Sequence, residues 1–249
     1  MRIALTGRDS AALLPLVREM GFQLDEVHPE AVVTYGGDGT FLMAEFQWPG
    51  IPKLAIRHDA TSTKCPDHQN TLVLQRLAKG DVPRTRLIKL AGSAKGRRIL
   101  AINDVTLNRT SPVMGVRYRV WINDEPYSGE IVGDGLVAAT PFGSTAYYRS
   151  ITRSFFRTGI GVAFNNSTEQ VDHLMLRETD CLRLVVTRGP AVLCGDNSPL
   201  IIELKQGEEA AIAKAEESAA LLAADTLFCK RCLRADGTPF NRLGGLQGL

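Results

Sequence analysis

The sequence has little excess charge and no long apolar run, and each of these shortages argues against particular classes of protein. Lys and Arg number 29 against 27 Asp and Glu, a formal net charge of +2. No long-range field therefore favours a nucleic acid or a membrane surface as partner. No apolar stretch approaches the roughly 20 residues of a membrane span. We expect neither nucleic acid nor membrane among the partners.

Cysteine is also scarce, and the chain lacks internal repeats and low-complexity tracts. The five cysteines are an odd number and lie scattered, which favours reduced thiols over a disulfide framework. Residues 1–6 are typical of a first strand and too short for the apolar region of a signal peptide. We therefore expect a cytoplasmic protein. Its 249 residues, 44% hydrophobic and 22% charged, suit one large globular domain or two modest ones.

A glycine-rich turn at residues 36–40, Gly-Gly-Asp-Gly-Thr, is the feature around which the chain is organised. Residues 31–35 are typical of a buried strand, and residues 41–46 of the opening of a helix. Glycines let the backbone approach a phosphate closely, and the free N–H groups of a helix start attract anions. Because phosphates repel a carboxylate, Asp38 indicates a base or a metal contact at a phosphoryl-transfer site. An Asp-Gly turn without a ligand is the alternative.

The first part of the chain alternates helix and strand signals. Residues 3–5 and 51–56 are predicted strands. Apolar residues recur at helical spacing over 13–20, and Pro15 places the start of the regular helix near Leu14. The alternation predicts a Rossmann-like parallel sheet covered by helices.

From residue 86 onward most signals are those of strands. Residues 116–122 alternate apolar and polar side chains, the period of a half-buried strand. Asn123-Asp124 then indicates a turn. The alanine-rich residues 210–224 favour a helix on propensity alone. A β-rich domain is therefore predicted after the α/β domain.

Two polar motifs in the β-rich part are candidates for a binding site. A strand is predicted to end at Thr140-Pro141, Gly143 then permits a turn, and hydroxyl groups and an aromatic ring follow at once. Such a turn can hydrogen-bond a ribose or an amide and pack against a flat ring. Asn103-Asp104 lies within residues 99–107, predicted to be extended. Polar residues in an apolar strand usually indicate a bulge or a site, and a satisfied edge turn is the alternative.

In their order and spacing, residues 36–40, Asn103-Asp104 and residues 133–147 resemble the NAD kinase family. The run Thr-Pro-Phe-Gly-Ser-Thr-Ala-Tyr is highly specific. The glycine-rich turn is not, because diacylglycerol-type lipid kinases share it. The segment from Gly207 on resembles the family's late β segment, which favours a strand over a helix there.

The resemblance implies two domains. The first is an α/β domain over residues 1–85, completed by a returning tail, residues 226–249. The second, residues 86–225, is a β-rich, sandwich-like domain that binds NAD.

The activity implied is phosphorylation of NAD at its adenosine ribose 2′-hydroxyl to give NADP, with ATP or polyphosphate as donor. Mg²⁺ or another divalent cation would accompany ATP, and no residue is assigned as a metal ligand. Asp38 would be the general base. The residues implied in phosphate or ATP binding are Gly36, Gly37, Gly39 and Thr40. Those implied in NAD binding are Asn103, Asp104, Asp134, Thr145, Ala146, Tyr147 and Ser150. In the family Asp134 often reaches NAD from a neighbouring subunit, so a homodimer or homotetramer is expected.

The sequence departs from the family in two places. Residues 57–62 replace a glycine-rich loop, and His58 there is a candidate phosphate contact. After Ser150 the family's Ala-Gly-Gly-Pro is replaced by Ile-Thr-Arg-Ser. If residues 148–157 are helical, Arg149, Arg153 and Arg157 share one face. Arg153 would then bind a phosphate together with Arg149, and a solvated basic face is the alternative.

Two other functions stay open at this point: a lipid kinase that shares the glycine-rich turn, and a nucleotide-binding relative without catalysis. Cys229 and Cys232 form a C-x-x-C pair. A structural zinc needs four ligands, which Cys65 and His68 could complete, although ordinary thiols are the simpler interpretation.

Overall fold

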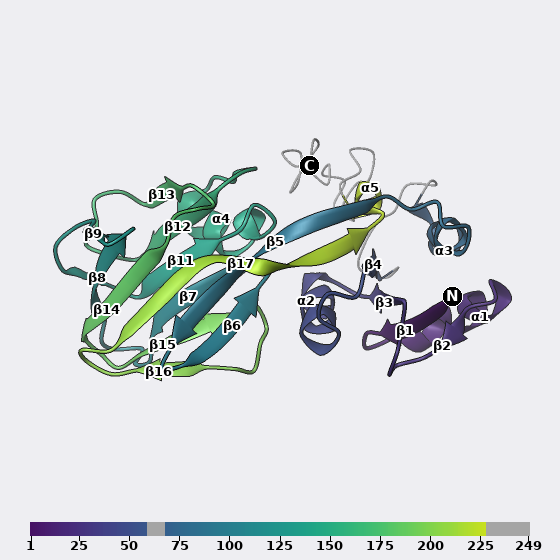
Figure 1. Cartoon of the computed structure of the whole chain (residues 1–249), viewed down its shortest axis with the longest axis horizontal. Helices are drawn as coiled ribbons and strands as arrows, with labels where there is room; N and C mark the ends of the chain where they lie inside the picture. The colour runs from purple at the N-terminus through teal and green to yellow at the C-terminus, as the bar shows by residue number, and fades with distance from the viewer. Residues whose placement is uncertain (59–67, 228–249) are drawn as a thin grey trace. The chain divides into compact units, whose positions relative to one another are not determined.

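The computed structural model describes residues 1–58 and 68–227, drawn in colour in Figure 1. These residues form two compact units. The first contains Met1–Leu87 together with the described residues from Ser218 onward, and the second contains Ile88–Glu217. Each unit has its own buried apolar core, which is the defining property of a domain.

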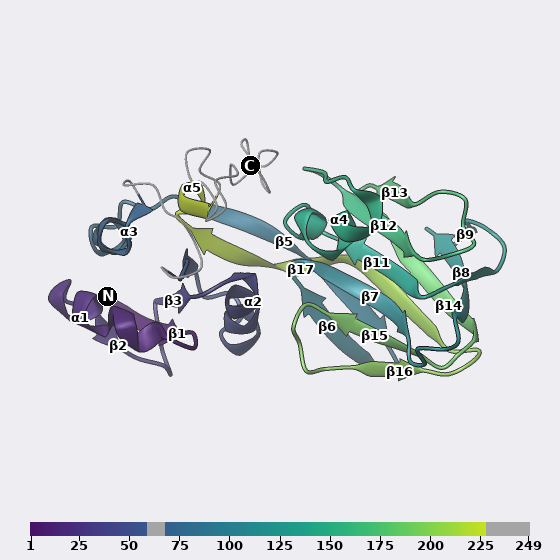
Figure 2. The same cartoon turned by 180° about the vertical axis from the view of Figure 1, so that it is seen from behind.

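The first unit is a parallel sheet with helices, seen from two sides in Figure 1 and Figure 2. Its elements are β1 (Arg2–Thr6), α1 (Leu14–Glu19), β2 (Gln23–Leu24), β3 (Ala31–Tyr35), α2 (Asp38–Gln47), β4 (Lys53–Ile56), α3 (Asn70–Ala78) and α5 (Ala224–Leu227). The strands lie in the order β2-β1-β3-β4, and the end of β17 (Glu209–Leu222) pairs with β4. All these pairs are parallel, so the predicted parallel sheet is confirmed.

Helices cover both faces of this sheet. Val33 packs in one cluster with Val17 of α1 and Leu74 of α3. The next residue, Val32, points to the opposite face and packs with Ala44 of α2. The sheet is thus buried on both sides, which explains why β3 reads as a continuous apolar run rather than an alternating one.

The second unit is a sandwich of two antiparallel layers. Its elements are the end of β5 (Arg84–Ala94), β6 (Arg97–Ala101), β7 (Asp104–Arg109), β8 (Val116–Ile122), β9 (Glu125–Pro126), β10 (Ile131–Gly133), β11 (Gly135–Ala139), α4 (Tyr147–Thr152), β12 (Ile160–Asn165), β13 (His173–Leu176), β14 (Leu182–Arg188), β15 (Ala191–Gly195), β16 (Ile202–Leu204) and the start of β17. One layer has the order β13-β12-β11-β7-β15-β16, and the other contains β10-β8-β14-β17.

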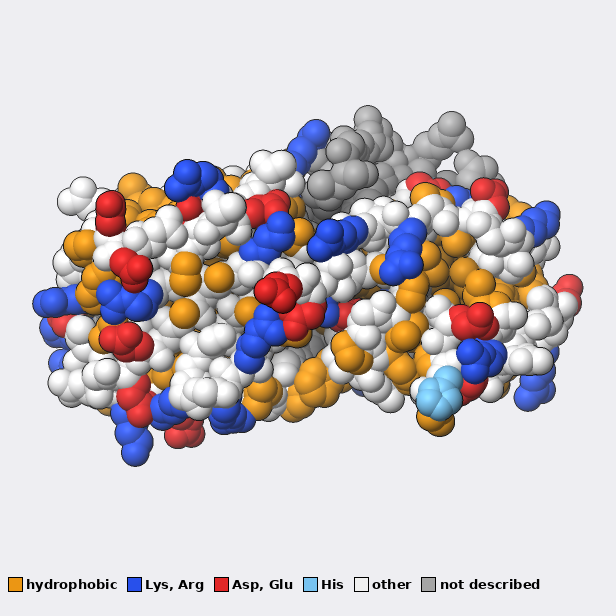
Figure 3. Space-filling model, in the orientation of Figure 1, with side chains coloured by type: hydrophobic (Ala, Val, Ile, Leu, Met, Phe, Trp, Pro, Cys, Tyr) orange, Lys and Arg blue, Asp and Glu red, His pale blue; other side chains and the backbone are white. Residues whose placement is uncertain are grey.

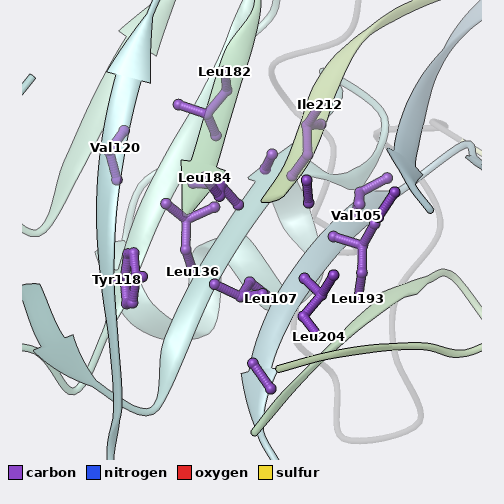
Figure 4. Packing of buried hydrophobic residues seen from close by; sticks show 14 of the residues in the cluster. Val105, Leu107, Tyr118, Val120, Leu136, Leu182, Leu184, Leu193, Leu204 and Ile212 are labelled. Atoms are coloured by element: carbon purple, nitrogen blue, oxygen red, sulfur yellow. The ribbon is translucent and has the colours of Figure 1, made fainter. Parts of the chain in front are cut away.

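Apolar side chains from the two layers meet in one core, shown in Figure 4. Leu107, Leu136 and Leu193 come from the six-stranded layer, and Tyr118 and Leu184 come from the other. The predicted β-rich, sandwich-like fold is confirmed.

Three local predictions are confirmed as well. Pro15 occupies the first turn of α1, which begins at Leu14, where the missing N–H of proline loses no helical hydrogen bond. β8 has the bounds expected from its alternating pattern. Asn123 and Asp124 form the turn after it with φ of 51° and 68°, a conformation that Asn and Asp tolerate better than most residues.

The alanine-rich segment is a strand, so the prediction from propensity alone is wrong and the one from the family resemblance is right. β17 pairs with β14 in one unit, for example Ile212 with Leu182, and with β4 in the other, for example Leu222 with Leu54. Helix propensities differ by less than about 1 kcal/mol per residue. The hydrogen bonds and burial that these pairings provide therefore override them.

The surface shows no gathering of one charge sign on the face drawn in Figure 3, where cationic and anionic side chains lie interspersed. Partly exposed ion pairs include Arg98 with Glu217 at 2.5 Å and Lys95 with Glu208 at 2.6 Å. Within residues 1–58 and 68–227, no helix has both the length and the apolar character needed to cross a membrane.

A buried ion pair between Glu45 of α2 and Lys53 of β4 links the helix to the strand that follows it. The Lys53 side chain is 0% exposed and donates to the Glu45 carboxylate and to the Trp48 carbonyl oxygen. The Gly50 N–H donates to the same carboxylate at 2.8 Å. Because a buried charge without its partner is strongly destabilising, this pair holds α2 against the sheet.

We expect Glu45→Ala to lower the free energy of unfolding by about 3–5 kcal/mol, because Lys53 stays buried without its carboxylate. The double variant Glu45→Leu with Lys53→Met should lose much less, since it buries no charge. Equilibrium urea unfolding of both variants measures the difference. A double variant as unstable as the single one would contradict this account of the pair.

Candidate active site

The glycine-rich stretch lies at the carboxyl end of β3 and leads directly into α2. The Gly36 N–H donates to the Ile56 carbonyl at 2.9 Å, which ties the turn to β4. Gly36 has a φ of 156°, which L side chains rarely adopt, and a Cβ there would lie 2.5 Å from Thr40 Oγ1, so the turn favours glycine. Gly37 is the extended N-cap of α2.

The helix begins earlier than the sequence predicts. α2 starts at Asp38 rather than after Thr40, so Asp38, Gly39 and Thr40 form its first turn. The expectation of a loop through Thr40 is wrong because the N–H groups of a first turn need no helical partner, and glycine costs little there. Asp38 is exposed and lies at the positive end of the helix, where a phosphate is favoured.

In the second unit, hydrogen bonds join two motifs that are far apart in the sequence: Asn103-Asp104 and the turn that begins at Thr140. The Thr140 N–H donates to the Asn103 carbonyl at 2.9 Å, and the Thr140 hydroxyl donates to the Ile102 carbonyl. The Gly143 N–H donates to Thr140 Oγ1 at 3.1 Å. A Cβ at Gly143 would lie 2.0 Å from the Asn103 carbonyl oxygen. Only glycine therefore permits this contact.

The single extended segment predicted over residues 99–107 is wrong. β6 ends at Ala101 and β7 begins at Asp104, with a bend between them. The bend is held by Asp196, whose carboxylate accepts N–H groups from Ile102 at 2.6 Å, Asn103 at 2.8 Å and Asp104 at 3.1 Å. These long-range bonds replace the ladder bonds that a continuous strand would need. Asn103-Asp104 thus lies at a bend whose N–H groups Asp196 satisfies, and its assignment to a binding site stays a prediction.

Two carboxyl groups share this junction. Asp104 is only 9% exposed, and its burial, together with the charge of Asp196, raises its pKa to about 7. Burial also raises the pKa of Asp196, while its three N–H donors act in the opposite direction. We assign the charge near neutral pH to Asp196, because its oxygens hold those donors.

Asp104 and Asn165 lie on one face of the six-stranded layer, because their partners Ala139 and Gly135 are four residues apart on β11. The hydrogen bond between Asn165 and the Tyr147 hydroxyl places Tyr147 beside this face. Burial raises the pKa of Tyr147, with smaller contributions from the charges of Asp104 and Asp134. The three side chains therefore lie in one neighbourhood of the second unit.

Side chains that the sequence does not single out hold this neighbourhood in place. Asn165 Nδ2 donates to the Tyr147 hydroxyl at 2.9 Å, and Asn166 Nδ2 donates to Asp134 at 3.3 Å. Arg109 Nε lies 2.7 Å from the same carboxylate. The Asn-Asn pair at the end of β12 is a turn signal that could have drawn attention to this corner.

The other residues in and after the turn at residues 140–147 differ in burial and in hydrogen bonding. Ser144 is 0% exposed and donates to the Pro141 carbonyl at 2.7 Å, so it serves the turn itself. Thr145 is half-buried and Ala146 is exposed. Ser150 is exposed and donates to the Tyr147 carbonyl at 2.7 Å, which leaves it on the surface of α4.

The predicted three-arginine face does not form. α4 ends at Thr152, and Arg153 adopts a left-handed conformation with φ of 58°. The Thr152 hydroxyl donates to the Tyr148 carbonyl at 3.1 Å and accepts the Ser154 N–H at 3.1 Å. This local turn competes with the helix and leaves Arg157 beyond its end.

In the part of the chain that the structure describes, no group of three or more His, Cys, Asp or Glu side chains is arranged so that it could hold a metal ion. Cys65, Cys229 and Cys232 lie outside the described residues. The zinc alternative is therefore untested.

Fold and site together define a class: an α/β domain with a glycine-rich helix start, joined to a β-sandwich with a buried polar junction. No family model matches the chain. An NAD kinase from Archaeoglobus fulgidus, solved in complex with ATP, superposes with a TM-score of 0.74 at 16% identity, over 89% of this chain and 93% of that one. Yeast NADH kinase, complexed with NADH, gives 0.69 at 21% identity, over 81% and 65%. These likenesses confirm the fold.

Sequence comparison points to the same group. A protein named NAD kinase from Lactobacillus gasseri is 27% identical over 169 residues, 61% of this chain and 62% of that protein. Another, from Koribacter versatilis, is 28% identical over 219 residues, 82% and 76% of the two chains. The chain thus spans less than two thirds of the first of these relatives. The resemblance to the NAD kinase family is confirmed.

Stability should fall with rising pH through the titration of Asp104. Its folded pKa, about 7, lies above the unfolded value of about 3.9. The folded state therefore binds more protons between these values, and the free energy of unfolding decreases as pH rises.

We expect Asp104→Asn to be more stable than the wild type at pH 8 and to lose this advantage toward pH 4. Asp124→Asn, in a turn where the side chain is 95% exposed, is the matched control. Thermal unfolding across this range measures both. A stability difference that stays constant with pH would remove Asp104 as the cause.

Proposed function

We propose that the protein is an NAD kinase, which transfers a phosphoryl group from ATP to the 2′-hydroxyl of the adenosine ribose of NAD. One observation carries the proposal. A chain similar to an NAD kinase over 82% of its length combines the helix start bearing Asp38 with the locked junction of Asn103 and Gly143. The first group suits phosphates and the second suits a nucleoside.

The chemistry needs few parts. Phosphoryl transfer depends mainly on positioning and on neutralising the charge of the phosphates. In this proposal the N–H groups at the start of α2, with Gly36, Gly37, Gly39 and Thr40, hold donor phosphates. Asp38 accepts the proton of the ribose hydroxyl as it attacks.

Mg²⁺ enters as part of the substrate, bound to ATP. Such an ion is commonly held by one or two carboxylates together with phosphate oxygens. Because Asp38 is assigned as the base, no residue of this chain is assigned as a ligand of the ion. When bound, Mg²⁺ would neutralise charge on the phosphates.

NAD binding is assigned to the second unit. Asn103 and Asp104 would contact the nucleoside, and the Tyr147 ring would pack against it. Asp134, Thr145, Ala146 and Ser150 complete the set. A lipid kinase has no such support, because the relatives named above are NAD kinases, and a non-catalytic relative is separated by the assay below.

Three finer assignments belong to the same proposal: use of polyphosphate as well as ATP, assembly as a homodimer or homotetramer, and residence in the cytoplasm. The free thiols of Cys181 and Cys194 accord with a reducing compartment. Sedimentation equilibrium of the purified chain tests the assembly, and replacement of ATP by polyphosphate tests the donor.

Incubation of the pure protein with NAD, ATP and Mg²⁺ should yield NADP. We expect Asp38→Asn to reduce kcat by about 10²–10⁴-fold, the usual contribution of a general base. Its affinity for NAD and its fold should persist, since Asp38 is exposed. Near-wild-type turnover in this variant would exclude Asp38 as the base.

We expect Asn103→Ala and Tyr147→Ala to weaken NAD binding more than ATP binding. Asn103 would lose hydrogen bonds to the nucleotide and Tyr147 would lose a packing face. Calorimetric titration with each nucleotide measures the two effects separately. An equal loss for NAD and ATP at an unchanged melting temperature would place these residues outside the NAD site.

A further inference from the structure

The first unit contains a topological switch point between β1 and β3. The chain leaves β1 through α1 and pairs as β2 on one side, whereas it leaves β3 through α2 and pairs as β4 on the other. In open parallel sheets, ligands bind at the carboxyl ends of the strands at such a point. The loops at this point are residues 7–9, which follow β1, and residues 36–38, which follow β3.

The strand ends at this edge are packed closely. A Cβ at Gly7 would lie 2.1 Å from the Tyr35 carbonyl oxygen, so the loop after β1 runs against the end of β3. The Gly36 N–H bonds to the Ile56 carbonyl at the end of β4. Residues from three strand ends therefore lie within reach of one small ligand.

His58, two residues beyond β4, reaches across this edge. Its Nε2 lies 3.3 Å from Asp9 Oδ2 in the loop after β1. Its ring centroid is 4.9 Å from that of Tyr35, at the end of β3, with an interplanar angle of 35°. The imidazole is thus held from two sides by residues of different strands, and its side chain is 27% exposed.

Cationic and acidic side chains both lie at this edge. Arg8 is exposed beside Asp9, and Arg57 precedes His58, with Nη2 3.5 Å from the Leu227 carbonyl. The carboxylates of Asp9 and Asp38 offset the charge of the two arginines, so a phosphate at this edge needs a further cationic contact. A doubly protonated imidazole donates one hydrogen bond from each nitrogen, so it can serve Asp9 and a phosphate oxygen at the same time.

We propose that His58, oriented by Asp9 and Tyr35, binds a phosphate oxygen of the phosphoryl donor at the carboxyl edge of the parallel sheet. The identity of the donor as ATP rests on the proposed function. The site itself requires only a polyphosphate group. His58 supplies the charge-assisted contact, and Asp9 is a positioning residue that acts through it.

The test measures binding of inorganic tripolyphosphate and of ATP to the full chain by isothermal titration calorimetry. We expect His58→Gln to weaken both about tenfold or more, the loss of one charge-assisted hydrogen bond. Asp9→Asn should weaken them severalfold, because the imidazole loses its orienting carboxylate. In the kinase assay His58→Gln should raise the KM for ATP and leave the KM for NAD unchanged.

His28→Gln is the matched control. His28 belongs to the same unit, but its N–H bonds to Asp25, which pairs with Arg2 at the amino end of β1. This variant should bind tripolyphosphate as the wild type does. Melting temperatures establish that each variant is folded, and Asp9→Asn carries the test if His58→Gln is not.

The outcomes separate this proposal from the kinase assignment. Unchanged tripolyphosphate affinity in His58→Gln and Asp9→Asn, an equal loss in His28→Gln, or no binding by the wild type would overturn the proposal. If the binding losses occur as expected but no NADP is formed, the kinase assignment fails and the phosphate site at His58 stands.

Discussion

The carboxylate of Asp196 is the constraint on which the β-sandwich site depends. It accepts three consecutive N–H groups where β6 stops and β7 begins, and these groups would otherwise be left without ladder partners. The bend that it holds presents the Asn103 carbonyl to the Thr140 N–H and to Gly143. Through that contact the turn before α4, and hence Tyr147, takes its position.

The junction fixes the bend between β6 and β7, but it does so by burying two neighbouring carboxyl groups, which is unfavourable. Burial raises the pKa of both carboxyl groups at the junction, and the charge of Asp196 raises that of Asp104 further. A purely structural junction would gain stability from an amide at position 104. Retention of an acid there is the pattern expected where function opposes stability.

The sequence predicts the elements whose bounds depend on neighbouring residues, and it misses those that depend on residues far away in the chain. β3 and β8 follow from periodicity, and the start of α1 follows from Pro15, because each depends on neighbouring residues alone. The break between Ala101 and Asp104 depends on Asp196, some ninety residues later, and no local pattern contains it. The end of α4 at Thr152 was missed because one side-chain hydroxyl decides it. Of the candidate site, the residue types were recognisable, but the corner formed by Asn165 and Asn166 was not.

In the proposed function the two units recognise their ligands by different physical means. The helix start of α2 offers backbone N–H groups, which attract any phosphate and depend on Gly36 and Gly37 for close approach. In the same proposal a cation from another strand end contacts the phosphate, so that Arg57 and His58 would take the place of a glycine-rich loop. The sandwich site has no such freedom, because a Cβ at Gly143 would collide with the backbone. We therefore expect substitutions near the proposed phosphate contacts to be tolerated better than a side chain at Gly143.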